Sequence, residues 1–294
     1  MTTLARCGRV RRRPNVTHTG REGTKVALFQ AILILWSILI IGPLLWVLLQ
    51  SFKGRVSVLT SPFALPRVWH FENYVTAWNS DGLGQSFANT LFVVGFALAF
   101  VMLFGSMCAY VIAQYQFFGH RIVYYLMLAG LTFPIFLAIV PLFFTLQAIG
   151  LLGTLAGLTV TYVAYALPFT VFFLYGFFRS LPREVAESAV MDGADKWRTF
   201  FLVMLPMAKR GLATVAIMNF LGLWNQYLLP VALNADPSRF VLSQAIANFA
   251  STSDYNVNYG ALFAGVVIVI LPVFIVYIVF QRELQGSVSQ GTMK

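Results

Sequence analysis

The chain has 294 residues, of which 59% are hydrophobic and only 10% are charged, and its formal net charge is +10. A soluble globular domain carries about 25% charged residues, so the composition excludes that class and indicates an integral membrane protein. The two cysteines, Cys7 and Cys108, fall in the N-terminal tail and inside a predicted span. They are not placed to form a disulfide with one another.

Apolar runs without charges predict an all-α membrane protein. A helix needs about 20 residues to cross the hydrocarbon core, so the long run 122–178 must hold two helices, and Gly150 to Thr154 is the natural turn between them. The predicted spans are 27–50, 87–113, 123–147, 155–178, 211–233 and 258–281. The predicted segments are a basic tail (1–25), a first transmembrane helix (26–52), an external loop (53–85), a core (86–281) and a C-terminal tail (282–294).

The distribution of Lys and Arg predicts the orientation of these spans. Six spans place both termini on one side, and 16 of the 20 basic residues lie on that side. By the positive-inside rule, both termini and the loop 179–210 are cytoplasmic. A basic run such as Arg9 to Arg13 can also bind nucleic acid, but its position beside a membrane span accounts for its charge without such a partner.

The loop 179–210 has its own local structure. Pro182 suits the start of a helix, and Glu184 and Glu187 follow in its first turns, where carboxylates complement the helix dipole. Gly193 can adopt the left-handed conformation that ends a helix, and Asp195 is a good N-cap for another. The loop therefore predicts a short helix, a sharp turn and a second short helix. A plain amphipathic connector on the bilayer surface is the alternative.

Each of these short helices has an apolar side. In the first helix, small apolar residues recur at helical spacing and form a flat stripe that a partner can approach closely. The second helix carries larger apolar residues. The first set is Val185, Ala186, Ala189 and Val190, and the second is Trp197, Phe200, Phe201 and Met204.

Neutral polar residues are concentrated in the fifth predicted span and at the start of the second. Amides in hydrocarbon either bond neighbouring helices or face a wet cavity, and rings beside amides suit a sugar. Because neighbours on a helix are turned about 100° apart, they cannot all face one way. We expect Asn219, with either Asn225 or Gln226, to face the cavity, and Trp224 to pack against a helix or anchor at the interface. The polar residues are Asn219, Trp224, Asn225, Gln226, Tyr227, Asn89 and Thr90.

Three kinds of motif do not occur in the sequence. The histidines, His18, His70 and His120, have no metal-ligand spacing, which argues against a metalloenzyme. No GxxxxGK[ST] loop is present, so an ATPase of that type must be another polypeptide. No predicted span contains Lys, Arg, Asp or Glu, which argues against a proton-coupled carrier. A sodium-coupled carrier that uses backbone carbonyls remains an alternative.

The loop sequence resembles a known family motif. Glu187-Ser188-Ala189, Asp192-Gly193-Ala194 and Leu205-Pro206 are similar to the EAA loop of ABC importer permeases. Together with Trp224-Asn225 and the tail from Leu271-Pro272 to Lys294, they resemble the smaller six-span partner of carbohydrate importers of the maltose and glycerol-phosphate type. The resemblance runs from about Ser86 to the C-terminus. Arg210 replaces a proline usual in that family, so we expect a less sharply bent start to the next span.

The resemblance implies a fold, partners and site residues. It implies the type I ABC importer permease fold in a bacterial inner membrane, and a heterodimer with a second permease. It also implies two ATPase subunits that bind ATP and Mg, and an external binding protein that delivers a carbohydrate. The loop around 236–257 would face the binding protein, and the tail after Arg282 would lie along the ATPases. The residues that would dock into the ATPase are Glu184, Glu187, Ala189, Asp192, Gly193 and Ala194.

The substrate class is less specific than the permease class. Permeases for amino acids, metals or phosphate share the EAA loop, so they remain alternatives to a sugar permease. The chain itself is expected to be a transport subunit without enzymatic activity.

Overall fold

The computed structural model describes residues 20–79, 82–251 and 258–290, and every regular element within them is helical. The chain divides into two compact units, 1–47 and 48–294. The helix α1 (Gly20–Gln50) makes up the described part of the first unit and ends in the second. Its segment from Lys25 to Gln50 is long and apolar enough to cross a membrane, as predicted for the first span.

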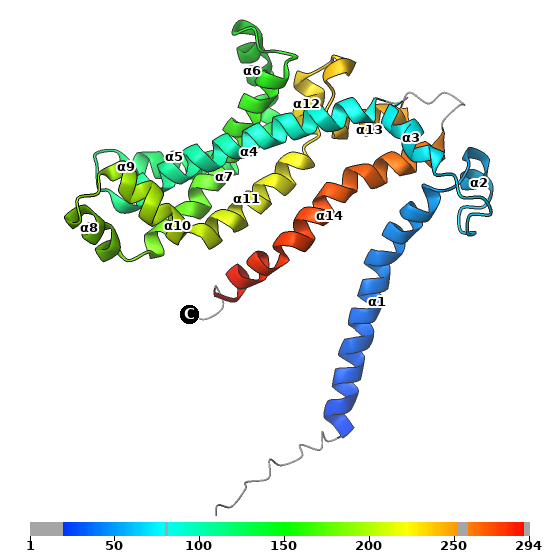
Figure 1. Ribbon diagram of the computed structural model, residues 1–294, viewed down its shortest axis with the longest axis horizontal. Coiled ribbons are helices and arrows are strands. Elements are labelled where there is room, and N and C mark those ends of the chain that lie inside the picture. The colour runs from blue at the N-terminus through cyan, green and yellow to red at the C-terminus, as the bar shows by residue number, and fades with distance from the viewer. Residues whose placement is uncertain (1–19, 80–81, 252–257, 291–294) are drawn as a thin grey trace, which may run out of the picture. The chain divides into compact units, whose positions relative to one another are not determined.

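The centre of the second unit is the pair α4 (Leu83–Gln114) and α7 (Leu155–Ser180), which pack along each other (Figure 1). Gly105 lets them approach closely, because a Cβ there would lie 2.5 Å from Cγ2 of Thr170. The helices α5 (His120–Thr132) and α11 (Lys209–Trp224) also pack on α7. The last helix, α14 (Tyr259–Gln290), packs on α11 and continues beyond the predicted end of its span.

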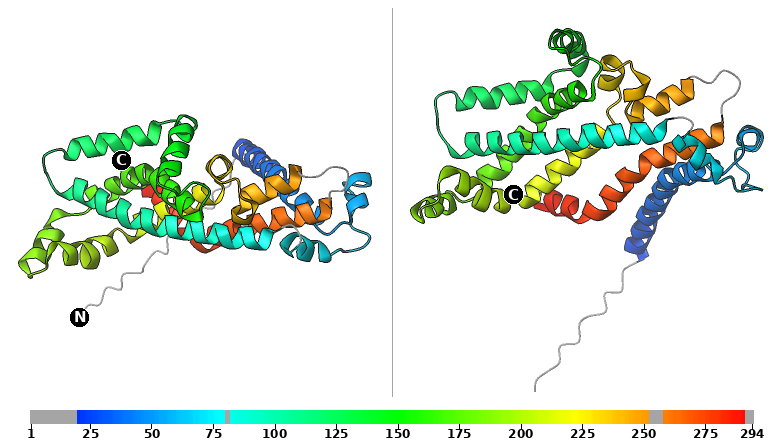
Figure 2. Two further views of the ribbon diagram at one scale, coloured as in Figure 1. Left: turned by 90° about the horizontal axis from the view of Figure 1, so that it is seen from above. Right: turned by 45° about the horizontal axis from the view of Figure 1, so that its top comes forward.

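The third predicted span is not one continuous helix. It is broken into α5 and α6 (Ile135–Ala148), which meet at an angle of 105°, so the prediction of an unbroken helix over 123–147 is wrong (Figure 2). The cause is Pro134, because the residue before a proline is disfavoured in helical geometry, and Phe133 is extended with ψ 124°. Proline alone does not break a span here, since Pro141, Pro168 and Pro272 lie inside helices.

The fifth span also departs from the prediction. Its helix α11 ends at Trp224, and α12 (Leu228–Leu233) follows after a short irregular segment. Before α11, the chain bends by 78° between α10 (Leu205–Met207) and α11. The chain therefore turns sharply although residue 210 is an arginine and not a proline, because Ala208 leaves helical geometry, with φ −82° and ψ 5°.

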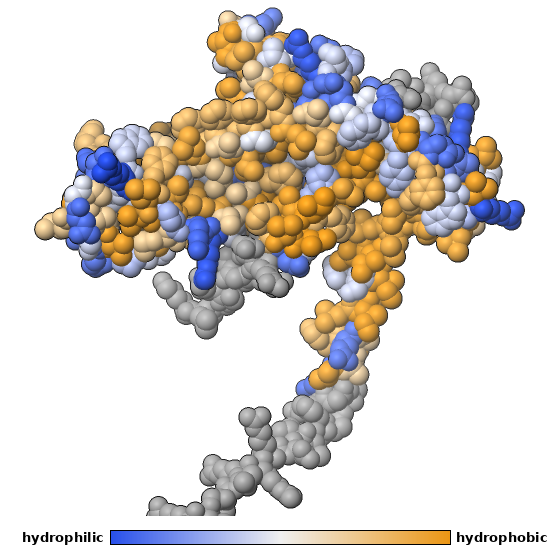
Figure 3. All heavy atoms as spheres, viewed as in Figure 1, coloured by the Kyte–Doolittle hydropathy of each residue, from blue (hydrophilic) through white to orange (hydrophobic). Residues whose placement is uncertain are grey.

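Four described helices are long and apolar enough to cross a membrane, and the count rises to six if each of two bent pairs forms one span. The continuous ones are α1, α4, α7 and α14. Hydrophobic side chains cover much of the surface of the second unit's helices (Figure 3). On α4, for example, exposed phenylalanines follow one face at every fourth position, at Phe92, Phe96, Phe100 and Phe104. These features establish an all-α membrane protein.

The predicted turn between the third and fourth spans is confirmed. Gly150 and Gly153 both have φ +71°, a conformation that glycine adopts without steric cost. Thr154 then caps α7, because its hydroxyl accepts a hydrogen bond from the backbone N–H of Gly157 at 2.9 Å.

The segments predicted as external loops contain further helices. The segment 53–85 holds α2 (Arg55–Thr60) and α3 (Glu72–Asn79), and η2 (Pro237–Arg239) and α13 (Leu242–Ser251) follow α12. They were missed because they are short and carry no long apolar run.

Buried hydrogen bonds fasten the segment after α1. Asn73 in α3 donates to the backbone carbonyls of Ser51 and Lys53, both at 2.9 Å. Lys53 is itself buried, and its ammonium donates to the carbonyls of Ser61 at 2.8 Å and Pro62 at 3.1 Å. Burial lowers the pKa of the Lys53 ammonium. The side chains of Lys53 and Asn73 thus bond backbone carbonyls 8 to 22 residues away and hold the segments around α2 and α3 to the chain that follows α1.

Candidate functional site

The loop 179–210 folds as its sequence predicts. The helix α8 (Arg183–Met191) begins directly after Pro182, and Gly193 turns the chain with φ +84°. The Asp195 carboxylate then accepts a hydrogen bond from the backbone N–H of Arg198 at 2.7 Å, which caps the next helix. The predicted helix, sharp turn and second helix are therefore confirmed.

The second helix is less regular than predicted. Only α9 (Lys196–Arg198) is α-helical at its start, and it passes into a π-helix, η1 (Thr199–Met204). A π-helix is rare and is found often at functional sites, because the extra residue per turn turns side chains to new directions. No signal in the sequence indicated it.

An aromatic cluster seats this loop on the membrane helices. Phe200 in η1 is buried, and its ring centroid lies 5.0 Å from that of Tyr110 in α4 and 6.4 Å from that of Phe178 in α7. Tyr110 and Phe178 also pack edge to face at 5.6 Å. Met204 is fully buried beside them. The loop and the ends of α4 and α7 therefore share one packed cluster.

The outer side of α8 combines acidic and apolar groups. Glu184, Glu187 and Asp192 are exposed, and within the described residues their carboxylates form no hydrogen bond or ion pair. Val190 and Met191 are also exposed, at 56% and 86%. Gly193 is exposed, and Ala189 and Ala194 are half-buried. Exposed apolar side chains rimmed by polar groups are typical of a surface that binds another protein.

A cavity of about 610 Å³ lies among α5, α6, α7, α11 and α12. Aromatic and neutral polar side chains line it, among them Thr161, Tyr165, Phe169 and Asn219. Asn219 is held in place by its Nδ2, which donates to the Thr170 hydroxyl at 2.7 Å. No charged residue lines this cavity.

The other polar residues of the fifth span have different surroundings. Trp224 is buried and its Nε1 donates to the carbonyl of Val269 at 3.1 Å, so the prediction that it packs against a helix is confirmed. Asn225 is exposed and bonds its own helix, and Gln226 accepts from the backbone N–H of Leu228 at 3.2 Å. Asn225 and Gln226 do not line the cavity. Sequence reasoning missed Thr161 and Tyr165, which lie on a different span.

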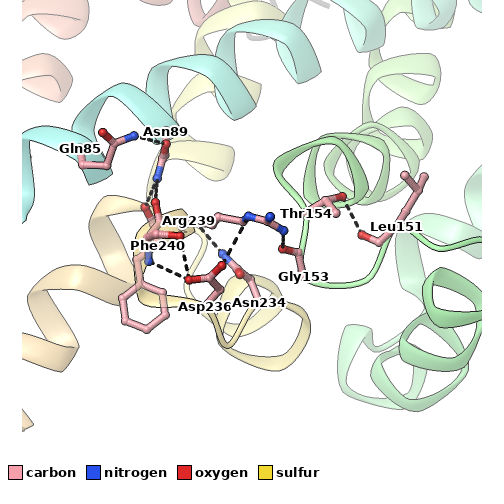
Figure 4. A network of polar contacts seen from close by, with 10 residues as sticks. Gln85, Asn89, Leu151, Gly153, Thr154, Asn234, Asp236, Arg239 and Phe240 are labelled. Carbon is pink, nitrogen blue, oxygen red and sulfur yellow. Dashed lines mark hydrogen bonds and ion pairs between the residues drawn. The ribbon is translucent and has the colours of Figure 1, made fainter.

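The polar start of the second span bonds neighbouring elements. Asn89 donates to the carbonyls of Ser238 and Phe240 at 3.2 and 2.9 Å (Figure 4). Thr90 accepts a hydrogen bond from the backbone N–H of Leu242 at 2.8 Å. These amide and hydroxyl groups therefore serve helix pairing, one of the two uses that the sequence left open.

Arg239 connects the same segment to the turn before α7. It donates to the carbonyl of Gly153 at 2.7 Å, and its guanidinium lies 3.5 Å from the Asp236 carboxylate (Figure 4). The hydroxyl and backbone N–H of Ser238 hold the pKa of Asp236 below its ordinary value. The backbone N–H of Gly153 donates in turn to the carbonyl of Leu233 at 3.0 Å. The α6–α7 turn and η2 are thus fastened together.

The sequence model of the family described as "Binding-protein-dependent transport system inner membrane component" matches residues 101–284 of this chain. The match includes the whole loop 179–210, the cavity and the aromatic cluster. The chain belongs to this family. It is a permease subunit of an ABC importer and not an enzyme.

Several relatives are similar over most of their length. The chain is 60% identical to the diacetylchitobiose uptake system permease protein NgcG of Streptomyces coelicolor over 91% of this chain and 89% of the relative. It is 30% identical to the trehalose transport system permease protein SugB of Mycobacterium tuberculosis, over 93% of this chain and 98% of the relative. A permease chain in the crystal structure of a bacterial ABC transporter that imports alginate has the same fold, with a TM-score of 0.81 at 21% identity over 90% of this chain and 98% of that chain.

Proposed function

We propose that this chain forms, with a second permease, the transmembrane pathway through which an oligosaccharide enters the cell. The single observation that supports this most is the 60% identity to a permease named for diacetylchitobiose uptake. Other relatives are named for trehalose and for multiple sugars. Diacetylchitobiose or a closely related short oligosaccharide is therefore the first candidate substrate.

The chemistry of the cavity supports a neutral sugar. Tyr165 and Phe169 offer flat apolar surfaces for the C–H faces of a sugar ring, and Thr161 and Asn219 offer hydrogen-bond partners for its hydroxyls. A cavity lined by neutral groups does not require a charged substrate. We assign Asn219 to the substrate path. Asn225 and Gln226, which follow the last residue of α11, do not line this cavity, and we do not assign them to the path.

Energy would reach the pathway through α8. In this proposal, Glu184, Glu187, Ala189, Asp192, Gly193 and Ala194 enter a cleft of a partner ATPase subunit. ATP and Mg are bound by the two ATPase subunits, so this chain supplies no catalytic group. Closure of the ATPases moves α8 and η1, and Phe200 transmits that movement to α4 and α7 through Tyr110 and Phe178. The helices then switch from inward-open to outward-open.

On the opposite side, an extracytoplasmic binding protein would deliver the sugar. A solved alginate importer is described in complex with a substrate-bound periplasmic protein. In this chain, the predicted contact is the loop 236–257, of which residues 236–251 are described. The hydrogen bond from Arg239 to Gly153 would keep part of that surface in a fixed position.

The substrate path is tested by comparing Asn219→Ala with Asn225→Ala in uptake assays on the assembled importer. Loss of the Asn219 amide should raise the half-saturating concentration of diacetylchitobiose by roughly tenfold, the effect of one buried hydrogen bond of about 1.4 kcal/mol. Asn225→Ala is the control, because its side chain bonds the carbonyl of Leu221 in its own helix and is exposed.

Stimulation of the ATPases by the loaded binding protein should persist in both variants. Equal, wild-type concentration dependence in the two variants would show that Asn219 is structural. Uptake driven by a sodium gradient without ATP would instead support the sodium-coupled carrier.

The proposed orientation is tested by labelling single cysteines. In a background without Cys7 and Cys108, a cysteine at Ser188 in α8 should react only from the cytoplasmic side. One at Ser251 in α13 should react only from the external side. Both native residues are exposed, so access to reagent should depend on the side alone. Labelling of both from outside would contradict a cytoplasmic α8 and cytoplasmic termini.

A further inference from the structure

A second cavity of about 360 Å³ lies where α4, α5, α7 and α8 meet. Its lining includes Arg121 at the start of α5, Arg179 at the end of α7 and Arg183 at the start of α8, together with His120. Neither Asp nor Glu is part of the lining. Three arginines from three helices therefore line one space, and no acidic residue among the described lining residues balances their charge.

The arginines also leave most of their hydrogen-bonding capacity unused. Within the described residues, the side chains of Arg121 and Arg183 form no hydrogen bond or ion pair. Arg179 donates one hydrogen bond, to the Tyr175 hydroxyl at 3.3 Å, and lies over that ring at 5.9 Å. Each guanidinium has five N–H donors, and arginine matches the oxygens of phosphate in geometry.

The tyrosine rings give this cavity a fixed wall. Tyr124 packs on Tyr175 with ring centroids 4.8 Å apart, and Tyr175 in turn supports Arg179. The Nδ1 atom of His120 lies 2.7 Å from the carbonyl of Phe117, so its ring is also held in place. Tyr124, Tyr175 and Arg179 thus contact one another in the wall of the cavity, whereas all three arginines remain accessible to solvent.

We propose that this cavity binds a phosphate group, and that the phosphate is the headgroup of an anionic phospholipid. The lipid source follows from the position of the cavity at the ends of α4, α5 and α7. On α5, Tyr125 of the lining and its neighbours in sequence Ile122 and Leu126 are each more than 60% exposed and apolar or aromatic. Acyl chains can lie on this face while the headgroup enters the cavity. Basic pockets between transmembrane helices on the cytoplasmic side bind lipid headgroups in this way.

The site bears on the coupling between the ATPase and the membrane helices, because Arg183 is the first residue of α8 and Arg179 lies in the last turn of α7. A bound headgroup would connect α5 to the start of the loop that docks into the ATPase. This consequence depends on the proposed role of α8, whereas binding of the lipid does not. A failure of the docking proposal would therefore leave the lipid site intact.

The test measures lipid retained by the assembled importer that contains the full chain. The importer is equilibrated in mixed micelles with phosphatidylglycerol or with phosphatidylcholine of the same acyl chains, and bound lipid is counted by native mass spectrometry. A separate arm adds inorganic phosphate as the competitor. The wild type should retain phosphatidylglycerol in preference to phosphatidylcholine. The double variant Arg121→Gln with Arg179→Gln should weaken this retention by roughly tenfold or more.

Two further variants make the result specific. Arg210→Gln removes one exposed positive charge on the same predicted side but outside the cavity, and it should retain phosphatidylglycerol as the wild type does. The double variant Arg121→Lys with Arg179→Lys keeps the charge and should recover part of the retention. Thermal unfolding of each variant checks that all remain folded.

The proposal is overturned if the glutamine double variant retains phosphatidylglycerol normally, or if Arg210→Gln loses as much. Equal retention of phosphatidylcholine would show that charge has no part in binding. Saturation by inorganic phosphate without any retention of lipid would contradict the lipid source. Retention by the isolated chain but not by the assembled importer would assign the cavity to a partner subunit and would also overturn the proposal.

Discussion

Replacing Gly193 with aspartate should abolish ATP-driven uptake while the chain remains folded and inserted. Gly193 has φ +84°, and no atom of this chain lies within 4 Å of the position that a Cβ would take. The chain itself therefore has room for a side chain there, and aspartate is one of the residues that tolerates this conformation. In the proposed complex, however, the side chain would enter the ATPase interface as an unpaired charge. Such a charge costs about 3 kcal/mol, which is roughly a hundredfold in affinity.

The matched control is Gly193→Asn, because asparagine has the same shape and the same tolerance of a positive φ but no charge. We expect this variant to keep a substantial part of the uptake. Transport is measured in vesicles at equal membrane abundance, together with pull-down of the ATPase subunits. Normal uptake by Gly193→Asp at normal abundance would show that the turn after α8 is not seated in a partner.

The second large effect is expected from Gly260→Ala, which should leave little folded protein in the membrane. A Cβ on Gly260 would lie 2.2 Å from the carbonyl oxygen of Lys53 and 2.5 Å from Nδ2 of Asn73. The Nδ2 of Asn73 donates a hydrogen bond to the Lys53 carbonyl oxygen at 2.9 Å, so neither atom can move away without loss of that hydrogen bond. Overpacking of this kind costs about 1–3 kcal/mol, and backbone contact places it at the upper end.

The control for this variant is Gly95→Ala in α4, where nothing lies within 4 Å of the new Cβ. Alanine is favoured over glycine in a helix by about 1 kcal/mol, so this variant should be as stable as the wild type or slightly more stable. Thermal unfolding in detergent compares the two. Equal melting temperatures for Gly260→Ala and Gly95→Ala would contradict the close packing of α14 against the segment after α1.

The parts of the structure that were predicted correctly depend on local signals. Pro182, Gly193 and Asp195 each specify the backbone of their own neighbourhood, so the helix, turn and cap around α8 could be read directly. The turn at Gly150 and Gly153 is a similar case, because both glycines adopt a positive φ that other residues avoid. The spans could also be predicted from the sequence, because the length of a charge-free apolar run can be counted without knowledge of the fold.

The errors arose where a choice depends on the surrounding structure. Pro134 breaks a span, whereas Pro141 and Pro168 lie inside helices, so the residue type alone does not predict the outcome. The sharp bend at Ala208 has no strong local signal, because alanine is a good helix former.

The cavity and the hydrogen bonds around Arg239 and Asn89 depend on contacts between distant residues. Arg239 bonds a carbonyl 86 residues away, and Asn89 bonds carbonyls about 150 residues away. Asn219 was recognised as a candidate because it is a polar residue in an apolar span, but Tyr165 and Thr161 could be placed beside it only once the helices were packed. A single sequence shows which residues of each helix are polar, but it does not show which residues of different helices face one another.

The absence of ionisable side chains from the predicted spans also has an electrical consequence. The groups that bond α7 to α11 in the membrane are neutral, as the pair of Asn219 and Thr170 shows. A formal charge that crosses the membrane field gains or loses about 2.3 kcal/mol per 100 mV. Helices that carry no such charge exchange no work of this size with the field when they change their tilt. A change of tilt in these spans would therefore carry no side-chain charge through the membrane field, and through them the resting potential would neither drive nor oppose the change.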